Sequence, residues 1–428
     1  MRVSYDWLKT MIDIPEDPKT LSDEYIRTGT EVEAIDTVGE SFDHVVTAKV
    51  LTKTPHPDSD HMYVCSVDVG DKNLDADGNP APLQIVCGAQ NFEAGDHIVT
   101  AMIGAELPGD IKIKKSKLRG VVSMGMNCSA RELGLGGDHS GIMILPEDTP
   151  CGMPFAEYVG SSDTVLDCEI TPNRPDCLSM IGMARETGAI FDRDFHVELP
   201  AIKAETGRAT DDELSVEIAD EGLCDRYVAR IVRNVKVGPS PDWMVKRLNA
   251  LGVRPHNNIV DITNYVMMLT GQPLHAFDLS TFAERDGHRR VVVRAAQQDE
   301  KFTTLDGEER VLDAGMGLIT DGERPVALAG VMGGMDSDND KPVAVAGVMG
   351  GANSEIEDDT VDVMVESACF NAGRTSHTSR DLSLISDASI RFERQVDETG
   401  CVDVANVTCA LIEEIAGGEV APGYVDVF

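Results

Sequence analysis

The densest group of basic side chains in the sequence lies in the segment IKIKKSKLRG, which contains Lys112, Lys114, Lys115, Lys117 and Arg119. Cations of this kind neutralise the phosphates of a nucleic-acid backbone. Alternation along a strand would place Lys112 and Lys114 on the same face. Lysines also protect the exposed edge of a sheet from pairing with another chain. The run therefore indicates either a phosphate-binding surface or a solvated strand edge.

A second group of candidate residues is dispersed over the last third of the chain: Arg254, His275 and Glu366. Arg254 precedes a proline, which favours an extended backbone displayed on a loop. Glu366 stands among apolar residues, where a carboxylate is either ion-paired or in contact with a specific ligand. Each of the three residues taken singly has a structural explanation: Arg254 as a surface arginine, His275 as a core histidine and Glu366 as a paired glutamate. The nearby glycine-rich loops, which let the backbone approach a ligand, favour a binding site.

The sequence contains no local motif for a nucleophile, a metal or a nucleotide. The segment GVMGG lacks the Lys and Ser/Thr of a phosphate-binding loop, and neither G-x-S-x-G nor H-E-x-x-H occurs. The ten cysteines form no CxxC pair, so no zinc site is predicted. We therefore expect no metal and no cofactor in this chain.

Composition limits the class of protein. The 428 residues include 74 acidic and 37 basic side chains, a net charge of -37. Such a charge argues against a protein that binds nucleic acid over its whole surface but permits a local basic patch. No apolar run approaches the ~20 residues of a membrane span, and the opening residues lack a signal-peptide core. Scattered cysteines in a chain of this size indicate buried thiols in a reducing, cytoplasmic compartment, with no membrane partner.

The elements that must position these residues change in type along the chain. From Val45 to Leu145, short apolar segments are cut by Gly, Pro and Asp, which predicts a small barrel or sandwich. Residues 167–191 read as a strand, a turn and a helix. Strands and helices are mixed beyond that point, and Ser240 is the predicted N-cap of one helix. Helices are predicted at 5–12, 240–251, 258–269 and 397–416.

One internal repeat is present. PVALAGVMGG (325–334) recurs as PVAVAGVMGG (342–351), with nine of ten positions identical. The spacing of 17 residues is too short for a solenoid unit, and there are only two copies. We interpret the repeat as a local tandem duplication.

Several longer segments resemble the β subunits of bacterial phenylalanine–tRNA ligases, and the resemblance covers essentially the whole chain. MRVSYDWLKTMIDI resembles the opening of that family. HPDSDHMYVCSVDVG, IVCGAQN and KSKLRGVVSMGMNCSARELGLG resemble its tRNA-binding OB-fold module. ITPNRPDCLSMIGMARE, NNIVDITNYVMMLTGQPLHAFD, LAGVMGG and SDASIRFERQVD resemble the segments around and within its editing domain.

This resemblance implies an α+β, multidomain chain in which an OB-fold β-barrel is inserted in a small N-terminal α/β domain, followed by a mixed α/β editing domain. The family's β chain continues further, so we expect this sequence to be an N-terminal portion of it. The implied ranges are 1–40 with 150–200 for the N-terminal domain, 41–149 for the OB-fold, 201–212 for a linker, 213–396 for the editing domain, and 397–428 for a terminal helix and the start of a downstream domain.

The resemblance also implies a function. In this family the α subunit attaches phenylalanine to tRNA(Phe) with ATP and Mg2+, and the β subunit contacts tRNA and hydrolyses mischarged Tyr-tRNA(Phe). The implied partners are the α subunit, in an α2β2 assembly, and tRNA(Phe), which the basic run 112–119 would contact. ATP and Mg2+ belong to the complete enzyme. The alternative is a non-catalytic tRNA-binding scaffold whose editing site is impaired by the duplication.

The family's editing-pocket residues match positions of this chain one by one. Arg254 matches an Arg that would hold the 3′ end of the tRNA, His275 matches a His that would orient or deprotonate water or hold the terminal adenosine, and Glu366 matches a Glu that would accept the phenol O–H of tyrosine. The matching positions for a Thr-Asp-Ala segment are Ser386, Asp387 and Ala388. Asn257 and Thr263 flank the same region.

Two departures from the family pattern concern glycines. Gln395 replaces a family Gly, which questions the backbone conformation there. The duplication also offers two sets of pocket glycines: Gly347 and Gly350 counted back from Glu366, or Gly330 and Gly333 counted forward. We favour the second copy, because GANSEIEDD then runs to Glu366 without a break.

Overall fold

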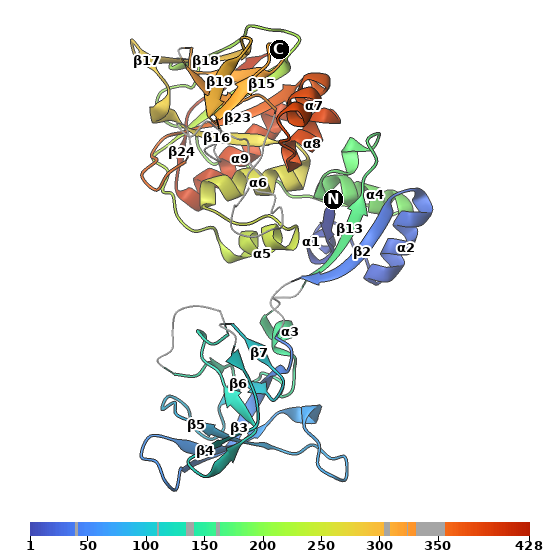
Figure 1. Cartoon of the computed structure of the whole chain (residues 1–428), viewed down its shortest axis with the longest axis vertical. Coiled ribbons are helices and arrows are strands. Elements are labelled where there is room, and N and C mark those ends of the chain that lie inside the picture. The colour runs from blue at the N-terminus through green and yellow to red at the C-terminus, as the bar shows by residue number, and fades with distance from the viewer. Residues whose placement is uncertain are drawn as a thin grey trace. The chain divides into compact units, whose positions relative to one another are not determined.

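The computed structural model describes residues 1–38, 42–108, 111–133, 141–159, 163–303, 309–322, 324–330 and 356–428. The chain forms two compact units, one of Met1–Val38 with Thr164–Phe428 and one of Gly39–Asp163 (Figure 1). None of the helices in these described stretches is long and apolar enough to cross a membrane.

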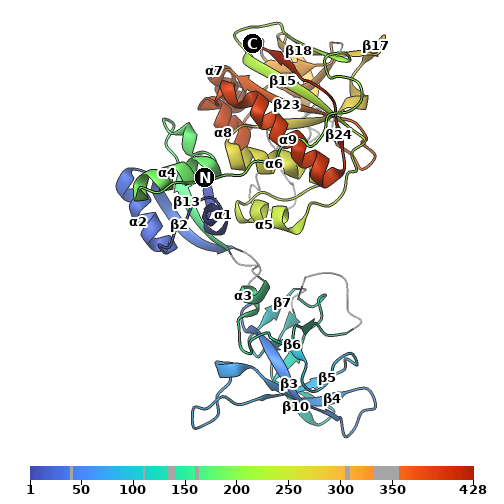
Figure 2. The same cartoon turned by 180° about the vertical axis from the view of Figure 1, so that it is seen from behind.

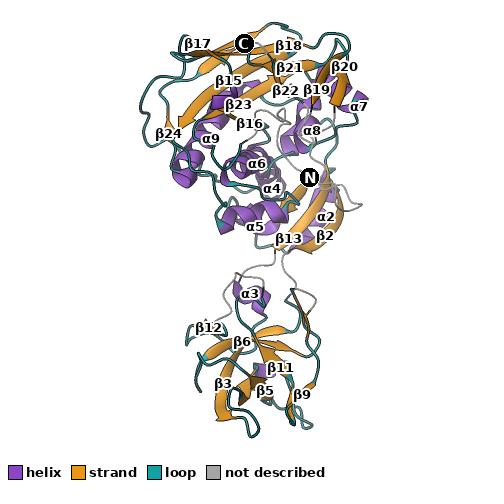
Figure 3. Cartoon of the chain, turned by 60° about the vertical axis from the view of Figure 1, so that its left-hand side comes forward, coloured by secondary structure: helices purple, strands orange, loops and turns teal. Residues whose placement is uncertain are grey.

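Unit Gly39–Asp163 contains a nearly closed, barrel-like sheet with the strand order β11-β6-β3-β4-β5 (Figure 3). The barrel closes because the Met124 N–H donates to the Gln84 carbonyl at 2.8 Å, which joins the region before β11 to β5. Val50, Val67, Ile85 and Ile98 fill the interior. The strands are β3 (Val45–Pro55), β4 (Tyr63–Asp68), β5 (Leu83–Cys87), β6 (His97–Met102), β11 (Gly125–Asn127) and β12 (Ile144–Leu145), which also pairs with β6, and helix α3 (Phe155–Val159) follows them.

The other unit begins with a three-stranded sheet of order β1-β13-β2. Arg2 of β1 pairs with Asp167 of β13. A strand that precedes the barrel in the sequence and a strand that follows it therefore lie in one sheet. Its elements are β1 (Arg2–Ser4), α1 (Tyr5–Lys9), α2 (Pro18–Thr28), β2 (Glu31–Val38), β13 (Asp163–Glu169) and α4 (Met180–Phe191).

Three further sheets and five α-helices make up the rest of the described part of this unit. One sheet has the order β16-β23-β15-β24, with β25 also paired to β15, a second has the order β14-β18-β21-β22, with β17 paired to β18, and the third is the β19-β20 pair. The strands are β14 (Leu214–Ile218), β15 (Cys224–Arg233), β16 (Leu274–Asp278), β17 (Glu284–Arg285), β18 (His288–Ala295), β19 (Glu300–Thr303), β20 (Glu309–Leu312), β21 (Gly317–Thr320), β22 (Pro325–Leu328), β23 (Val363–Phe370), β24 (Glu419–Val420) and β25 (Val425–Val427).

The helices are α5 (Asp242–Ala250), α6 (Asn258–Thr270), α7 (Ala372–Asp381), α8 (Asp387–Glu393) and α9 (Cys401–Ala416). Figures 1 and 2 show α6 and α9 side by side beneath the β15–β23 sheet. Cys401 and Ala405 of α9 pack on the face that carries Val228 and Cys369. Residues 397–428 therefore share a core with the sheet that precedes them.

Three local predictions need correction. Residues 18–28, where no helix was predicted, form α2, because Asp17 caps its first turn and Leu21 and Tyr25 are fully buried. Ser240 does not cap α5; its hydroxyl donates to the Asp261 carboxylate at 2.5 Å. Helix α9 begins at Cys401 rather than at 397, although its end before Gly417 is as predicted.

Candidate functional site

The β16–β23–β15 sheet brings two of the predicted site residues together. His275 of β16 pairs with Glu366 of β23, which in turn pairs with Ala229 of β15. Directly opposed residues in antiparallel strands project from the same face. The imidazole and the carboxylate, 91 positions apart in the sequence, are thus neighbours on one face, and α9 packs on the opposite one.

Glu366 is 2% exposed, and its carboxylate accepts a hydrogen bond from the Tyr227 hydroxyl at 2.5 Å. Burial raises the pKa of Glu366 to about 7, and the hydrogen bond from Tyr227 opposes that rise. Burial raises the pKa of the Tyr227 phenol as well, so this side chain is the proton donor. The predicted acceptor of a phenol is therefore already bonded to a phenol of its own chain, a partner that the sequence alone did not reveal.

His275 has a partly exposed side chain, but its ring Nε2 is buried and bonds to no group in the described part of the chain. Burial lowers the pKa of His275 to about 3, so the imidazole is neutral at neutral pH. Its ring lies edge-on to Phe277, with 4.1 Å between the centroids. A base this weak accepts a proton poorly, whereas the free Nε2 remains suited to one positioning hydrogen bond.

Ser386 and Ala388 begin helix α8. The Ser386 hydroxyl accepts from the Ser389 N–H at 3.1 Å, and the Ser386 N–H donates to the Ser389 hydroxyl at 2.8 Å, which forms a capping box. Asp387 pairs with Arg391 at 3.0 Å, and Ala388 is buried. These contacts give the Ser-Asp-Ala segment a structural role at the helix start.

The remaining predicted residues lie in different local settings. Arg254 is exposed between α5 and α6. Asn257 caps α6 through its side chain, and the Thr263 hydroxyl donates to the Val260 carbonyl at 2.7 Å within that helix.

Of the repeat, the structure describes residues 325–330. They form β22, which pairs with β21, and end at Gly330, where φ is +72°. A Cβ on Gly330 would lie 2.6 Å from the Thr375 hydroxyl, so a side chain would collide with α7. Gly333, Gly347 and Gly350 lie outside the described residues, and the choice between the two copies stays a prediction.

The basic run lies between the fourth and fifth barrel strands, β6 and β11. It is not one strand: β8 (Ile111–Lys112) pairs with β7 (Glu106–Leu107), and β9 (Ser116–Leu118) pairs with β10 (Val121–Ser123). Arg119 and Gly120 form the β9–β10 turn with φ of +41° and +91°. Two positive φ values are the mark of a type I′ hairpin turn.

This segment contacts the connection between β3 and β4. The Arg119 guanidinium donates to the Asp58 carbonyl at 3.0 Å, and the His56 ring bonds to the Leu118 carbonyl at 3.1 Å. Residues 39–163 contain nine Lys and Arg residues, and five of them lie within 112–119. The positive charge of this unit is therefore concentrated on one segment.

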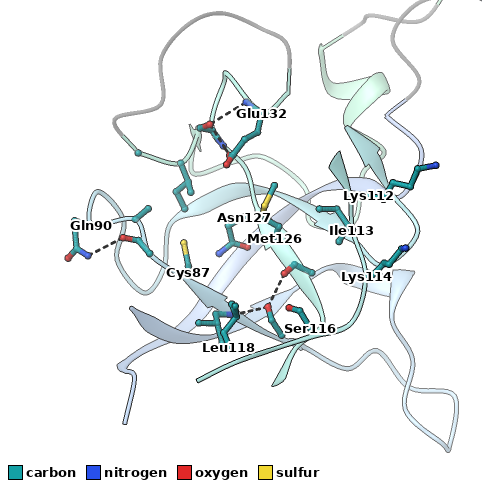
Figure 4. Close-up of a pocket in the computed structure, with 18 residues that line it drawn as sticks. Cys87, Gln90, Lys112, Ile113, Lys114, Ser116, Leu118, Met126, Asn127 and Glu132 are labelled. Atoms are coloured by element: carbon teal, nitrogen blue, oxygen red, sulfur yellow. Dashed lines mark hydrogen bonds between the residues drawn. The ribbon is translucent and has the colours of Figure 1, made fainter. Parts of the chain in front are cut away.

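Lys112 and Lys114 line a cavity of about 610 Å³, beside Ile113, Met126 and Asn127 (Figure 4). The two lysines lie on the same side of this cavity, as their alternation predicted, although Lys112 ends β8 and Lys114 lies in the connection between β8 and β9. Lys112 pairs with Glu106 at 2.6 Å. Lys115, Lys117 and Arg119 do not line the cavity.

No cluster of His, Cys, Asp and Glu among the described residues could hold a metal ion. All ten cysteines are described and free, and all except Cys151 are buried.

Two domain families match the sequence. The B3/4 domain matches residues 223–338 and 336–417, and the putative tRNA binding domain matches residues 45–154. The two B3/4 matches meet between the copies of the repeat. The tRNA-binding match covers the barrel and the basic run, and the B3/4 match covers β15, β16 and β23.

Whole-chain relatives are phenylalanine–tRNA ligase β subunits. Those of Syntrophotalea carbinolica and Syntrophus aciditrophicus are each 44% identical over 428 residues, which is 100% of this chain and 49% of each relative. That of Geobacter metallireducens is also 44% identical, with 50% of its length covered. The chain spans about half the length of the curated relatives it matches.

One solved structure, an N-terminal fragment of the phenylalanyl-tRNA synthetase β-subunit from Pyrococcus horikoshii, aligns with a TM-score of 0.31 and 13% identity over 63% of this chain and 67% of that chain. With 44% identity along its whole length, the chain is similar to phenylalanine–tRNA ligase β subunits over about half of their length.

Proposed function

We propose that unit Gly39–Asp163 binds tRNA through the basic segment 112–119. The observation that carries this proposal is the concentration of five cations on one segment of a unit with nine, in a chain of net charge -37. Phosphate binding by such a protein requires a local positive patch. The match of residues 45–154 to a putative tRNA binding domain supports the same assignment.

We also propose that the barrel is an OB-fold. Its strands close in the order first, second, third, fifth, fourth and back to the first, as five-stranded OB barrels do. OB-folds bind oligonucleotides with the loops after their first and fourth strands. In this chain those loops contain Asp58 and Arg119, which are joined by a hydrogen bond.

The finer domain division stays part of this proposal, with the OB-fold over 41–149 inside a domain of 1–40 and 150–200, and an editing domain over 213–396 after the linker 201–212. The helix α9 shares the core of the preceding sheet, so for 397–428 we propose membership of that sheet unit.

The test reverses charge at Lys114 and Lys115. Binding of a tRNA(Phe) transcript to the full chain should weaken, and the slope of log K against log salt should flatten by about one unit for each lost phosphate contact. Lys72→Glu, a reversal elsewhere in the same unit, is the matched control. An unchanged slope in the double variant would show instead that the basic run is a solvated strand edge.

A second proposed function is hydrolysis of mischarged Tyr-tRNA(Phe) by the unit that carries Glu366. The supporting observation is chemical: this buried carboxylate accepts a phenol O–H at 2.5 Å. Tyrosine differs from phenylalanine by that hydroxyl, and a site built to bond it discriminates far better than a hydrophobic pocket that merely excludes it.

We propose roles for the other predicted site residues as well. His275, with its lowered pKa, would position water or the terminal adenosine through Nε2 rather than act as a strong base. Arg254 would hold the 3′ end, Ser386 and Ala388 would border the pocket, and backbone N–H groups of the glycine-rich segment would stabilise the oxyanion. The alternative remains a scaffold with an editing site impaired by the duplication.

The editing test compares Glu366→Ala with Tyr227→Phe in an assembled enzyme. Loss of a charge-assisted hydrogen bond costs roughly 1.5–3 kcal/mol, so Glu366→Ala should slow Tyr-tRNA(Phe) hydrolysis at least about tenfold and spare aminoacylation. Tyr227→Phe, which frees the acceptor, should keep hydrolysis. If both variants lose stability, hydrolysis and aminoacylation together, the contact between Glu366 and Tyr227 has only a structural role in the core.

Deletion of residues 331–347, which leaves one copy of the repeat, separates the two alternatives. Hydrolysis that appears only after the deletion would support the impaired scaffold.

The activity of the whole protein is also a proposal. We propose that this chain works with an α subunit in an α2β2 phenylalanine–tRNA ligase of the cytoplasm, where ATP and Mg2+ act in the α subunit. The family assignment supports this arrangement. ATP–pyrophosphate exchange by the pure chain would contradict it.

A further inference from the structure

The cavity beside the basic segment is lined by both apolar and polar side chains (Figure 4). Val86, Ile113 and Met126 contribute apolar surface, and Asn127 at the end of β11 and Glu132 contribute polar groups. A cavity of about 610 Å³ is roomy enough for a nucleotide. Apolar surface of this kind favours a flat ring over a small hydrated anion.

Asn127 carries a hydrogen-bond donor that the described residues do not use. Its side chain is 5% exposed, and its Oδ1 accepts from the Thr100 hydroxyl at 3.1 Å. Its Nδ2 is buried and has no hydrogen-bond partner within the described ranges. Burial raises the pKa of the Cys87 thiol and a side-chain contact with Asn127 lowers it, so this sulfur lies near the amide, but sulfur is a weak acceptor. A buried donor without a good acceptor costs free energy that a ligand carbonyl would recover.

Charge at the rim complements a nucleotide strand. Lys114 is exposed and pairs with no group in the described stretches, and Lys112 lies on the same side of the cavity. Two cations next to a partly apolar cavity match a base flanked by its phosphates, although Lys112 is paired with Glu106 and Glu132 also lines the cavity.

We infer that this cavity takes one unpaired nucleobase of an RNA strand, whose ring carbonyl accepts a hydrogen bond from Asn127 Nδ2, while Lys112 and Lys114 hold the adjacent phosphates. The inference rests on the proposed RNA binding by the same unit. A base in a duplex has its edge paired and its faces stacked, so the site selects an unpaired nucleotide. A purely aliphatic ligand would leave the amide donor unsatisfied.

The test uses the full chain and two fluorescent decamers: oligouridylate, and a strand of equal length whose riboses carry no bases. The phosphates of the two strands are the same, so the difference in affinity measures recognition of the base. We expect the oligouridylate to bind at least about tenfold more tightly, because stacking and one hydrogen bond are lost with the base. Equal affinity for the two strands would overturn the inference without any mutation.

The variant Asn127→Leu, similar in size, should lose most of this preference with an unchanged salt slope, because no phosphate contact is removed. Asn73→Leu, in the connection between β4 and β5, is the matched control and should keep the preference. A preference retained by Asn127→Leu would also overturn the inference. Loss of tRNA binding on reversal of Lys114 and Lys115, without any base preference, would sustain the proposed function and reject only this site.

Discussion

The pair of Glu366 and Tyr227 shows how one buried contact links stability to pH. Both side chains are in the core, where removal of water disfavours the carboxylate and raises the pKa of Glu366 to about 7. An unfolded glutamate titrates near 4.5. Between these values the folded protein binds more protons than the unfolded chain, so the contribution of Glu366 to stability falls as pH rises through this interval.

Glu366→Gln should remove that dependence. Between pH 5 and pH 8 the wild-type chain should lose up to roughly 3 kcal/mol of unfolding free energy relative to the variant. Urea unfolding of both proteins at each pH, followed by tryptophan fluorescence, measures the difference. Glu31→Gln on the surface is the control. A pH-independent difference between wild type and Glu366→Gln would contradict this account.

The residue after the C-cap of helix α8 has a backbone conformation that glycine favours, although the residue there is glutamine. The helix is capped by Arg394, and Gln395 follows with φ of +72°. The position after a helix C-cap commonly adopts this left-handed conformation, and glycine occupies it at the lowest cost. The backbone at Gln395 thus adopts the conformation that glycine favours, at the position where the resemblance led us to expect a glycine.

Gln395→Gly should therefore stabilise the chain by about 1 kcal/mol, because relief of the left-handed strain exceeds the entropy that glycine adds to the unfolded state. A higher urea midpoint with an unchanged slope would be the expected result. Gln297→Gly, where φ is not positive, should lower the midpoint instead. A loss of stability at both positions would show that the left-handed turn carries no strain.

At the scale of the whole molecule, the two tryptophans report on only one unit. Trp7 stacks on Tyr265 at 5.0 Å, Trp243 meets the same ring edge-on at 5.2 Å, and Arg247 lies over both indoles. All four residues belong to Met1–Val38 with Thr164–Phe428. Residues 39–163 contain no tryptophan.

A substitution that leaves a cavity in the core of the barrel unit should therefore shift the unfolding transition of that unit without shifting the tryptophan signal. Phe155 is fully buried and packs edge-on against Phe42 at 4.9 Å. Phe155→Ala should cost about 3–5 kcal/mol within that unit and lower an unfolding transition seen by circular dichroism. The tryptophan midpoint should stay in place. A parallel fall of the tryptophan midpoint would mean that the two units unfold as one.

The sequence by itself determined the features that depend on residues close together in the chain. The barrel strands, the helix ends at Gly271 and Gly417 and the density of cations at 112–119 all follow from residues within a few positions of one another. The resemblance to a ligase β subunit, read from ordered motifs, was confirmed by relatives 44% identical along the whole chain.

Only the tertiary structure decided which distant groups meet. Strand register placed His275 beside Glu366, and packing supplied Tyr227 as the partner of that carboxylate. Folding of the barrel unit placed the Asn127 amide and Lys114 on the same cavity. Burial, pKa and hydrogen-bond satisfaction depend on groups brought together from far along the chain, so no local pattern around any one of these residues could have predicted them.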